Sequence, residues 1–320
     1  MRVHRQSWRD PMITTVTLHA AIDRTIYVDQ FEAGHVHRVA RQIDEPGGKG
    51  INVAKVIRQL GGQVTTTGII AGNNGAFIEN SLAERGIRTD FIQAAGESRV
   101  CLNILDDSSG SSTELLGQGP AISEADIEAI KEKVHGLASQ SSTVVISGSL
   151  PPGTPDTLYA ELIRIVRSTG ARSFLDTGGT AFRAGLTASP DFLKPNEQEL
   201  TEWLGRRPRD VREWTRSAQM LADLGVDEVC VTLGSQGALA ILSGVAYRVK
   251  PPTIQPVNTV GCGDAFVAGM AYAGERGDSA ESRLRTAVSA ATANAMSSTA
   301  GDMDSRLFEE YEQLVQILPL

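Results

Sequence analysis

The sequence predicts an α/β fold in which helices cover both faces of a mostly parallel sheet, with a small β-sheet beside it. Short apolar runs alternate with amphipathic stretches along most of the 320 residues, which is the pattern of repeated strand–helix units. Glycine follows many of the amphipathic stretches, where its left-handed conformation ends a helix. No low-complexity segment divides the chain. We therefore expect one domain over residues 13–320, preceded by a loose extension over residues 1–12.

Each element is predicted from its periodicity and from the residues that flank it. Core strands are expected at residues 13–18, 64–70, 143–147, 173–176, 228–233 and 238–242. Helices are expected at residues 51–60, 75–85, 123–138, 157–168, 197–204, 211–224, 263–273, 280–297 and 305–317. Ser123, with Asp126 three residues later, predicts a capping box at one helix start.

Four short runs fall outside this alternation. They lie at residues 27–31, 36–43, 99–105 and 113–116. We expect them to form the small sheet. A small sheet beside a doubly wound domain suits a lid over a ligand cleft, with lid segments at about 25–44 and 97–117.

Composition and charge argue against several functional classes. A formal charge of -8 argues against broad nucleic-acid binding, which needs clustered Lys and Arg. No apolar run reaches the length of a membrane-spanning helix, and residues 1–11 lack the apolar core of a secretory signal. Cys101, Cys230 and Cys262 lie far apart without CxxC spacing, which predicts reduced thiols and a cytoplasmic protein. The natural start stays open between Met1 and Met12.

The segment Gly261-Cys262-Gly263-Asp264 is the strongest candidate for chemistry. Two glycines allow a tight turn at the start of a predicted helix, whose free N–H groups and dipole attract an anion. A carboxylate beside such a site would repel a resting phosphate. Its presence is explained if Asp264 accepts a proton from an attacking hydroxyl while the N–H groups hold a phosphoryl group in transit. Asp264 also suits a helix cap, so the spacing alone leaves both roles open.

A second glycine-rich segment, at residues 45–52, leads into the helix predicted at 51–60. Its glycines allow a ligand to approach the backbone closely. Lys49 suits a phosphate contact and Asn52 suits a hydroxyl group. Because Lys49 is followed by Gly, the segment is not a Walker A loop. An ordinary glycine-rich turn is the alternative.

Further polar residues follow predicted strands, and such loops line the ligand cleft of open α/β sheets. Asp23 follows the first strand and suits a pair of sugar hydroxyls, or an ordinary turn. The oxygens of Asn196 and Glu199 suit Mg²⁺, directly or through water. The other candidates at this edge are Ser147, Lys194, and the turn of Thr232, Gly234 and Gly237, which suits a nucleotide phosphate.

Four segments together resemble the ribokinase-like, or phosphofructokinase B, carbohydrate kinases. They are PGGKGINVA at 46–54, SGSLPPG at 147–153, KPNEQEL at 194–200 and TVGCGDAF at 259–266. The resemblance covers about residues 13–320 and is greatest to the hexose-phosphate branch, which holds 1-phosphofructokinase and tagatose-6-phosphate kinase. It implies a ribokinase-like fold with a β-sheet lid, ATP with Mg²⁺ as donor, and a sugar-phosphate hydroxyl as acceptor.

The resemblance also implies roles for individual residues. It implies Asp264 as the base and Gly261, Cys262 and Gly263 as the anion hole. On the substrate side it implies contacts from Asp23, Gly48, Lys49, Asn52, Asn103 and Ser147, with Arg99 and the lid residue Arg38 as candidates for the substrate phosphate. On the nucleotide side it implies Lys194, Thr232, Gly234 and Gly237, with Asn294 near the adenine. Glu114 matches an acidic lid residue of unassigned role.

Three positions depart from the family pattern. His19-Ala20 stands where the family has Asn-Pro, and Leu105 stands where the branch often has Lys or His. Cys262 replaces the usual Ala. Because a thiol at a helix N-terminus can have a depressed pKa, we expect alkylation of Cys262 to inactivate the enzyme and ATP to protect it.

The predicted activity is ATP-dependent phosphorylation of a ketohexose monophosphate. Fructose 1-phosphate is the first choice, followed by tagatose 6-phosphate and fructose 6-phosphate. A non-catalytic sugar-phosphate sensor is a rival from another class, and a nucleoside or free-sugar kinase is a third reading. Arg99 and Arg38 argue against a neutral substrate. The expected assembly is a homodimer through the lid, with no nucleic-acid or membrane partner.

Overall fold

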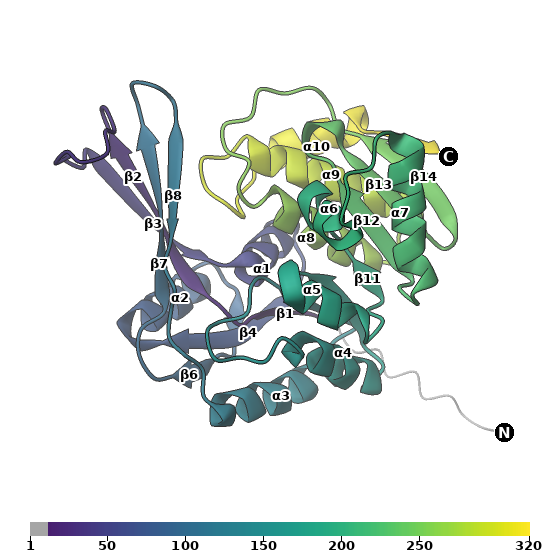
Figure 1. Cartoon of the computed structure of the whole chain (residues 1–320), viewed down its shortest axis with the longest axis horizontal. Helices are drawn as coiled ribbons and strands as arrows, with labels where there is room; N and C mark the ends of the chain where they lie inside the picture. Colours follow the sequence, from purple (N-terminus) through teal and green to yellow (C-terminus); the bar gives the residue numbers. More distant parts are fainter. Residues whose placement is uncertain (1–11) are drawn as a thin grey trace.

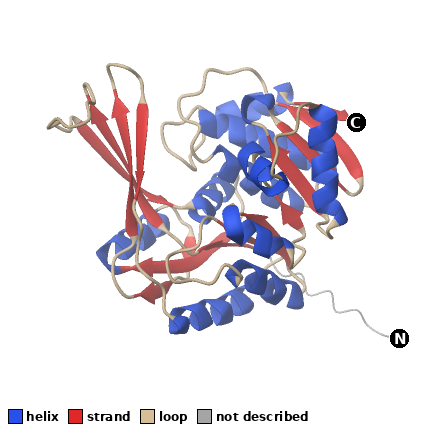
Figure 2. Ribbon diagram, viewed as in Figure 1, coloured by secondary structure: helices blue, strands red, loops and turns tan. Residues whose placement is uncertain are grey.

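A computed structural model describes residues 12–320, which form a helix-covered main sheet with a smaller sheet beside it (Figures 1 and 2). The main sheet has the strand order β15-β14-β13-β12-β11-β10-β9-β1-β4-β5, and β6 pairs with β4. The strands pair in parallel from β5 to β12, and antiparallel from β12 to β15. The predicted α/β architecture is therefore confirmed. The predicted N-terminal extension falls on residues 1–11, which lie outside the described residues, and on Met12.

The strands of the main sheet are short, with two to eight residues each. The parallel strands are β1 (Ile13–Thr17), β4 (Val64–Ala71), β5 (Arg88–Thr89), β6 (Ile92–Ala94), β9 (Thr143–Ser147), β10 (Arg172–Asp176), β11 (Phe192–Leu193) and β12 (Glu228–Thr232). The antiparallel strands are β13 (Ala238–Leu242), β14 (Val245–Lys250) and β15 (Gln316–Pro319). Side chains of β1, β4 and β9 are buried throughout, because helices cover both faces.

Two hydrophobic cores lie on the two faces of the main sheet. One core packs β-strand residues against α1 (Lys49–Gln59), α2 (Gly72–Glu84), α8 (Cys262–Glu275), α9 (Ala280–Ala295) and α10 (Ser305–Leu314). The other packs them against α3 (Glu124–Ala138), α4 (Leu158–Ser168), α5 (Gly179–Leu186), α6 (Glu197–Leu204) and α7 (Val211–Asp223). A short 3₁₀ turn, η1 (Gly234–Gln236), joins β12 to β13.

The small sheet projects from the rest of the molecule at the upper left of Figure 1, and its base contacts α1 and α2. Its order is β3-β2-β7-β8, from β2 (Ala21–Val28), β3 (Arg41–Gly47), β7 (Arg99–Asp106) and β8 (Ser112–Leu116). The predicted small sheet is confirmed, although β2 begins six residues earlier than the run predicted at 27–31. We call these four strands and the loops between them the lid sheet.

Local signals set several helix ends. The side chain of Ser123 accepts from the N–H of Asp126 and the Asp126 carboxylate accepts in return, so the predicted capping box is confirmed. After α1, Gly61 takes φ 87°, and its N–H bonds to the carbonyl of Arg58. The helix predicted at 305–317 ends at Leu314, because the chain then pairs with β14 as the edge strand β15.

The position of β1 determines where a ligand cleft forms. β1 lies between β4 and β9, and the chain runs from β1 towards β4 but from β9 towards β10, so the connections reverse direction between these two strands. Such a switch point leaves a crevice at the carboxyl edge of an open α/β sheet. None of the helices among residues 12–320 is both long and apolar enough to span a bilayer.

Candidate active site

A cavity of about 1290 Å³ lies between the lid sheet and the carboxyl ends of the parallel strands. Both halves of the chain line it. The lid sheet, the loop before α1 and the start of α1 contribute Asp23, Arg99, Asn103, Glu114, Gly48, Lys49 and Asn52. The second half contributes Lys194, Asn196, Thr232, Gly234, Gly237, Gly261, Cys262, Gly263 and Asp264. The glycine-rich segments that are 200 residues apart in sequence therefore face one cavity, which is large enough for two small ligands.

Asp264 lies in the first turn of α8 at the floor of this cavity. Its side chain is 6% exposed, and Oδ2 accepts a hydrogen bond of 2.9 Å from Nδ2 of Asn52. Burial raises the pKa of Asp264 to about 7, although Lys49, Asn52 and Lys194 partly oppose the shift. A carboxyl with this pKa is half ionised near neutral pH, which suits a general base.

The turn before Asp264 has the geometry of an anion site. Gly261 is the N-cap of α8 at φ 83°, in the left-handed region that favours glycine. A Cβ added at Gly261 would lie 2.9 Å from the backbone nitrogen of Gly301, so the position also requires a close approach. The N–H of Cys262 lies 3.4 Å from the carbonyl of Thr259, and the N–H of Ala265 bonds to the carbonyl of Gly261. The N–H groups of Gly263 and Asp264 between them are left to bind negative charge.

Two lysines and a buried aspartate lie beside this turn. Oδ1 of Asp176, at the end of β10, accepts from Nζ of Lys49 at 3.2 Å and from Nζ of Lys194 at 3.1 Å. Burial alone would raise the pKa of Asp176, but the two ammonium groups lower it overall. Lys49 also lies 3.7 Å from Glu199. Asp176 was not among the residues predicted for the site. Its position at the carboxyl end of a predicted strand is the sequence feature that could have identified it.

The side chains of Asn196 and Glu199 each accept a hydrogen bond from the backbone N–H of the other residue. Asn196 Oδ1 accepts from the N–H of Glu199 at 2.8 Å, and Glu199 Oε2 accepts from the N–H of Asn196 at 2.8 Å, which forms the capping box of α6. No group of three or more His, Cys, Asp or Glu residues suited to a metal occurs within residues 12–320. Asn196 Oδ1 and Glu199 Oε2 are each already bonded to a backbone N–H.

Asp23 lies in a different local structure from the one predicted. It was expected in a loop after the first strand, but it lies inside β2, opposite Glu45 and Cys101. Pairing with two neighbouring strands keeps this segment extended. A Cβ added at Gly47 would lie 2.1 Å from Asp23 Oδ2, so the carboxylate occupies the space above a glycine. Burial raises the pKa of Asp23 to about 6.

Arg99 is held at the root of the lid sheet. Its Nε and Nη2 donate to the carbonyl of His19 at 3.2 and 3.0 Å. Burial and the nearby Arg99 lower the pKa of His19 to about 4, so its ring is neutral. The ring lies 2.9 Å from the carbonyl of Gln118 and 3.0 Å from the hydroxyl of Ser149. His19 was noted only as a departure from the family pattern, and it lines the cavity.

Four predicted site residues lie outside the cavity lining, and one of them is Glu199, which was predicted for Mg²⁺. Arg38 is exposed in the loop between β2 and β3. Ser147 is completely buried at the end of β9, and the neighbouring Gly148 and Ser149 line the cavity instead. Asn294 is also completely buried, because its Nδ2 donates to Val260 and its Oδ1 accepts from Gly301. Asn294 therefore joins two loops.

An apolar wall forms the other end of the cavity. Thr232, Gly234 and Gly237 lie beside it, as predicted for the nucleotide half. The wall itself was not predicted, and it consists of Pro251, Pro252, Ile254, Val288, Ala291 and Ala295. These residues come from the loop after β14 and from α9, so only the packing of α9 against the sheet brings them together. A flat apolar ring fits such a surface.

Cys262 does not have the depressed pKa that its position predicted. Burial raises the pKa of its thiol, although a 3.5 Å contact from Nδ2 of Asn294 opposes the shift. Burial and the nearby Asp264 carboxylate outweigh the groups that lower this pKa. Inactivation by alkylation of Cys262 stays a prediction.

Comparisons with known proteins identify the family. Residues 14–306 match the pfkB family of carbohydrate kinases. A 1-phosphofructokinase of Vibrio cholerae serotype O1 is 32% identical over 310 residues, which cover 96% of this chain and 97% of that protein. The crystal structure of phosphofructokinase-2 from Escherichia coli in complex with potassium has a TM-score of 0.91 at 29% identity, covering 95% of this chain and 99% of the other. Ribokinase from Arabidopsis thaliana, complexed with ribose and ATP, shares the fold with a TM-score of 0.75 at 23% identity. The match covers 95% of this chain and 99% of the other.

The chain therefore belongs to the pfkB family of carbohydrate kinases and is an ATP-dependent sugar kinase with a ribokinase-like fold.

Proposed function

We propose that this kinase transfers the γ-phosphoryl group of ATP to a ketohexose monophosphate, with fructose 1-phosphate as the first choice and fructose 1,6-bisphosphate as the product. The observation that carries the proposal is the buried carboxyl of Asp264, whose pKa of about 7 suits a general base. The identity of 32% to a protein named 1-phosphofructokinase supports this choice of sugar phosphate.

In the proposed reaction, a sugar hydroxyl attacks the γ-phosphorus of ATP and gives its proton to Asp264. A bond forms between the hydroxyl oxygen and the γ-phosphorus, the bond from that phosphorus to the β–γ bridging oxygen breaks, and ADP leaves. Asn52 holds Oδ2 of Asp264 at 2.9 Å, which leaves Oδ1 to receive the proton. The N–H groups at the start of α8 hold the charge on the phosphoryl oxygens in transit.

The lysines beside the anion turn compensate for phosphate charge. Lys194 lies against the turn, because a Cβ added at Gly263 would be 3.3 Å from its Nζ. Asp176 fixes the direction of both Lys194 and Lys49. A Mg²⁺ ion, when bound, would neutralise phosphate charge, and Asn196 and Glu199 would reach it through water.

Arg99 is the proposed contact for the substrate phosphate. Two of its nitrogens are held by the carbonyl of His19, so the guanidinium is oriented before the substrate binds. Arg38 no longer supports this assignment, since it lies outside the cavity lining. Asp23 and Asn103 are the proposed contacts for sugar hydroxyls. Tagatose 6-phosphate and fructose 6-phosphate remain the alternative substrates.

A panel of hexose phosphates tests the proposal through kcat/KM measured by coupled ADP release. We expect fructose 1-phosphate to have the highest kcat/KM. A higher kcat/KM for another ketohexose phosphate would change the proposed substrate but not the proposed phosphoryl transfer. Absence of ADP release with every phosphorylated sugar, together with tight binding of one of them, would favour a non-catalytic sensor instead.

A further inference from the structure

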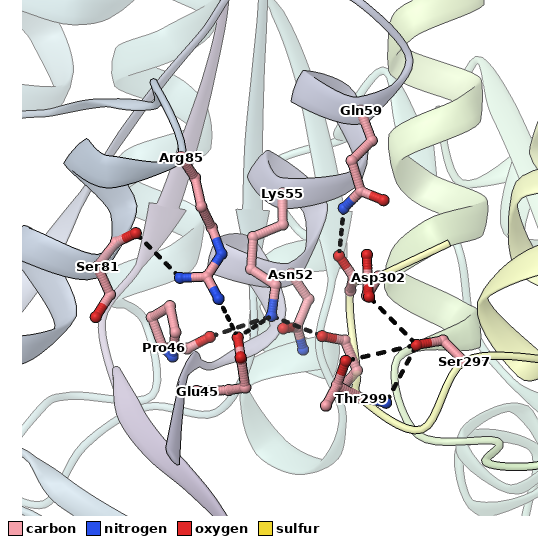
Figure 3. Close-up of polar contacts among 12 residues, drawn as sticks. Glu45, Pro46, Asn52, Lys55, Gln59, Ser81, Arg85, Ser297, Thr299 and Asp302 are labelled. Carbon is pink, nitrogen blue, oxygen red and sulfur yellow. Dashed lines mark hydrogen bonds and ion pairs between the residues drawn. The ribbon is translucent and has the colours of Figure 1, made fainter. Parts of the chain in front are cut away.

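Lys55 is a buried cation in the middle of α1 that the proposed mechanism does not use. Its side chain is 3% exposed. Nζ donates to the carbonyl of Ala300 at 2.6 Å and to the carbonyl of Pro46 at 3.3 Å, and it lies 3.8 Å from Oε2 of Glu45 (Figure 3). Burying an ammonium group is costly unless acceptors surround it. The acceptors around Lys55 come from two separate parts of the chain.

The two backbone carbonyls belong to opposite sides of the active site. Pro46 lies in β3 at the root of the lid sheet, two residues before Gly48. Ala300 lies in the loop between α9 and α10, which we call loop 297–303, and it lines the cavity beside Thr299. The side chain of Lys55 therefore joins the substrate half of the site to the nucleotide half.

Loop 297–303 packs directly against the catalytic groups. A Cβ added at Gly301 would lie 2.9 Å from Oδ1 of Asn52, whose Nδ2 donates to Asp264. On its other side, a Cβ added at Gly261 would lie 2.9 Å from the nitrogen of Gly301. A shift of this loop would therefore disturb both the anion turn and the residue that orients the base.

The charge of Lys55 also acts on the Asp23 carboxyl. Four charged groups act on Asp23: Lys55 from α1, Arg99 from β7, Glu114 from β8 and Glu45 from β3. Burial raises the pKa of Asp23 to about 6, and Lys55 makes the largest opposing contribution. Loss of the ammonium group would raise this pKa further, so Asp23 would lose its charge at a higher pH.

We propose that Lys55 is a positioning residue for phosphoryl transfer, whose ammonium group ties loop 297–303 to the root of the lid sheet. The inference rests on the proposed function of Asp23 and Asp264. Lys55 acts through its neighbours and does not line the cavity. Its effect should therefore appear in orientation and in pH dependence.

The substitution Lys55→Met tests this role, because Met keeps the length of the side chain without its charge. We expect kcat/KM for the sugar phosphate to fall roughly 10- to 100-fold, since small displacements of reacting groups cost about this much. Asp264 sets the acid limb of kcat/KM near pH 7 in the wild type. We expect this limb to steepen and to move to higher pH in Lys55→Met, because Asp23 then loses its charge nearer to pH 7. Lys55→Arg keeps the charge and should leave the acid limb at its wild-type position.

Arg85→Met is the matched control. Arg85 binds the same Glu45 oxygen at 2.6 Å, also donates to the carbonyl of Ser81 and is half exposed (Figure 3). Its loss removes a cation from the same carboxylate without touching loop 297–303. We expect this variant to keep the wild-type pH profile. An equal loss of kcat/KM and an equal shift of the acid limb in Arg85→Met would overturn the proposal, as would a wild-type profile in Lys55→Met.

Hydrogen exchange of the ligand-free protein separates this inference from the proposed function. The N–H groups of Gly301 and Met303 are bonded to Asn294 and Gln59. We expect faster exchange across loop 297–303 in Lys55→Met, but not in Arg85→Met. If hydrogen exchange of loop 297–303 is unchanged in Lys55→Met, Lys55 does not hold this loop to the lid sheet. That result would overturn the inference even if the enzyme is a 1-phosphofructokinase. If Lys55→Met fails to fold, Lys55→Arg still tests the charge, because a displaced acid limb in that variant contradicts the proposal.

Discussion

Asp264 shows how burial and a polar neighbour set the chemistry of one residue. Its carboxyl lies in the first turn of a helix, where a negative charge is stabilised, yet burial raises its pKa to about 7. Asn52 donates to one carboxyl oxygen and so leaves the other to act. The carboxyl therefore takes up a proton readily at the pH where a kinase works.

Asp264→Asn should leave ATP binding nearly intact and lower kcat by roughly 100-fold or more, because it removes the proton acceptor while Asn52 keeps an oxygen to bond. Single-turnover kinetics and nucleotide titration measure the two effects separately. The control is Asp223→Asn, an exposed change at the end of α7 that should not alter kcat. Retention of most of the turnover in Asp264→Asn would refute the assigned base.

The raised pKa of Asp264 also predicts how stability depends on pH. The folded pKa of about 7 exceeds the ordinary value of 3.8, so between these values the native state holds more protons than the unfolded state. Wild-type stability should therefore fall as pH rises toward 7. Asp264→Asn has no carboxyl to ionise, so it should not lose stability in this way. In mildly alkaline buffer its free energy of unfolding should exceed that of the wild type by on the order of 1 kcal/mol or more.

Chemical unfolding at several pH values measures this difference. The gap between Asp264→Asn and the wild type should close as the pH approaches 4, where both side chains are neutral. A gap that is constant with pH would mean that the pKa of the Asp264 carboxyl is not raised in the folded protein. In the wild type, the same ionisation should make kcat/KM rise with pH through about 7.

Among the elements, α1 depends on a close approach to β1. Gly50 lies in its first turn, and a Cβ there would lie 2.5 Å from Oγ1 of Thr17 and 2.8 Å from the carbonyl of Val16. The backbone conformation does not require glycine at this position. Glycine is required because there is no space for a Cβ. This contact places Lys49 and Asn52, which flank Gly50, at the cavity.

Gly50→Ala should destabilise the protein by roughly 1–3 kcal/mol through overpacking, although Ala is the better helix former. It should also lower kcat, since α1 carries Asn52. Gly136→Ala in α3 is the matched control, because a Cβ there meets no atom within 4 Å. That change should stabilise the protein by about 0.5–1 kcal/mol. Equal effects of the two substitutions in thermal unfolding would contradict the packing argument.

At the scale of the whole molecule, the lid sheet carries exposed apolar side chains. Val36 is 99% exposed and Leu116 is 70% exposed. An open sheet with such side chains favours association with another sheet. We therefore still expect a homodimer through the lid.

Leu115→Glu should weaken this dimer, because it places a charge on the outermost strand of the lid sheet. Light scattering coupled to size exclusion measures the mass as the protein is diluted. Leu224→Glu is the matched control, since Leu224 at the end of α7 is 53% exposed and Leu115 is 52% exposed. A monomeric wild type, or equal dissociation of both variants, would contradict a lid interface.

The sequence by itself determined the α/β class, most helix ends and the two glycine-rich segments, because these depend on local periodicity and on the conformations open to glycine. It also predicted Asp264, Lys49 and Asn52 as site residues, and all three line the cavity. Their roles came from residue chemistry together with the resemblance to a family. Local signals failed for Asp23, where pairing with two strands replaced a predicted turn.

Only the tertiary structure decided which residues meet. Asn52 and Asp264 are 212 residues apart in sequence, and Lys55 and Ala300 are 245 apart. Burial also decided which predicted residues are excluded from the cavity, such as Ser147 and Asn294, and it raised the pKa of Cys262. Distance between side chains and exclusion of water are properties of the packed chain, so no local pattern of residues specifies them.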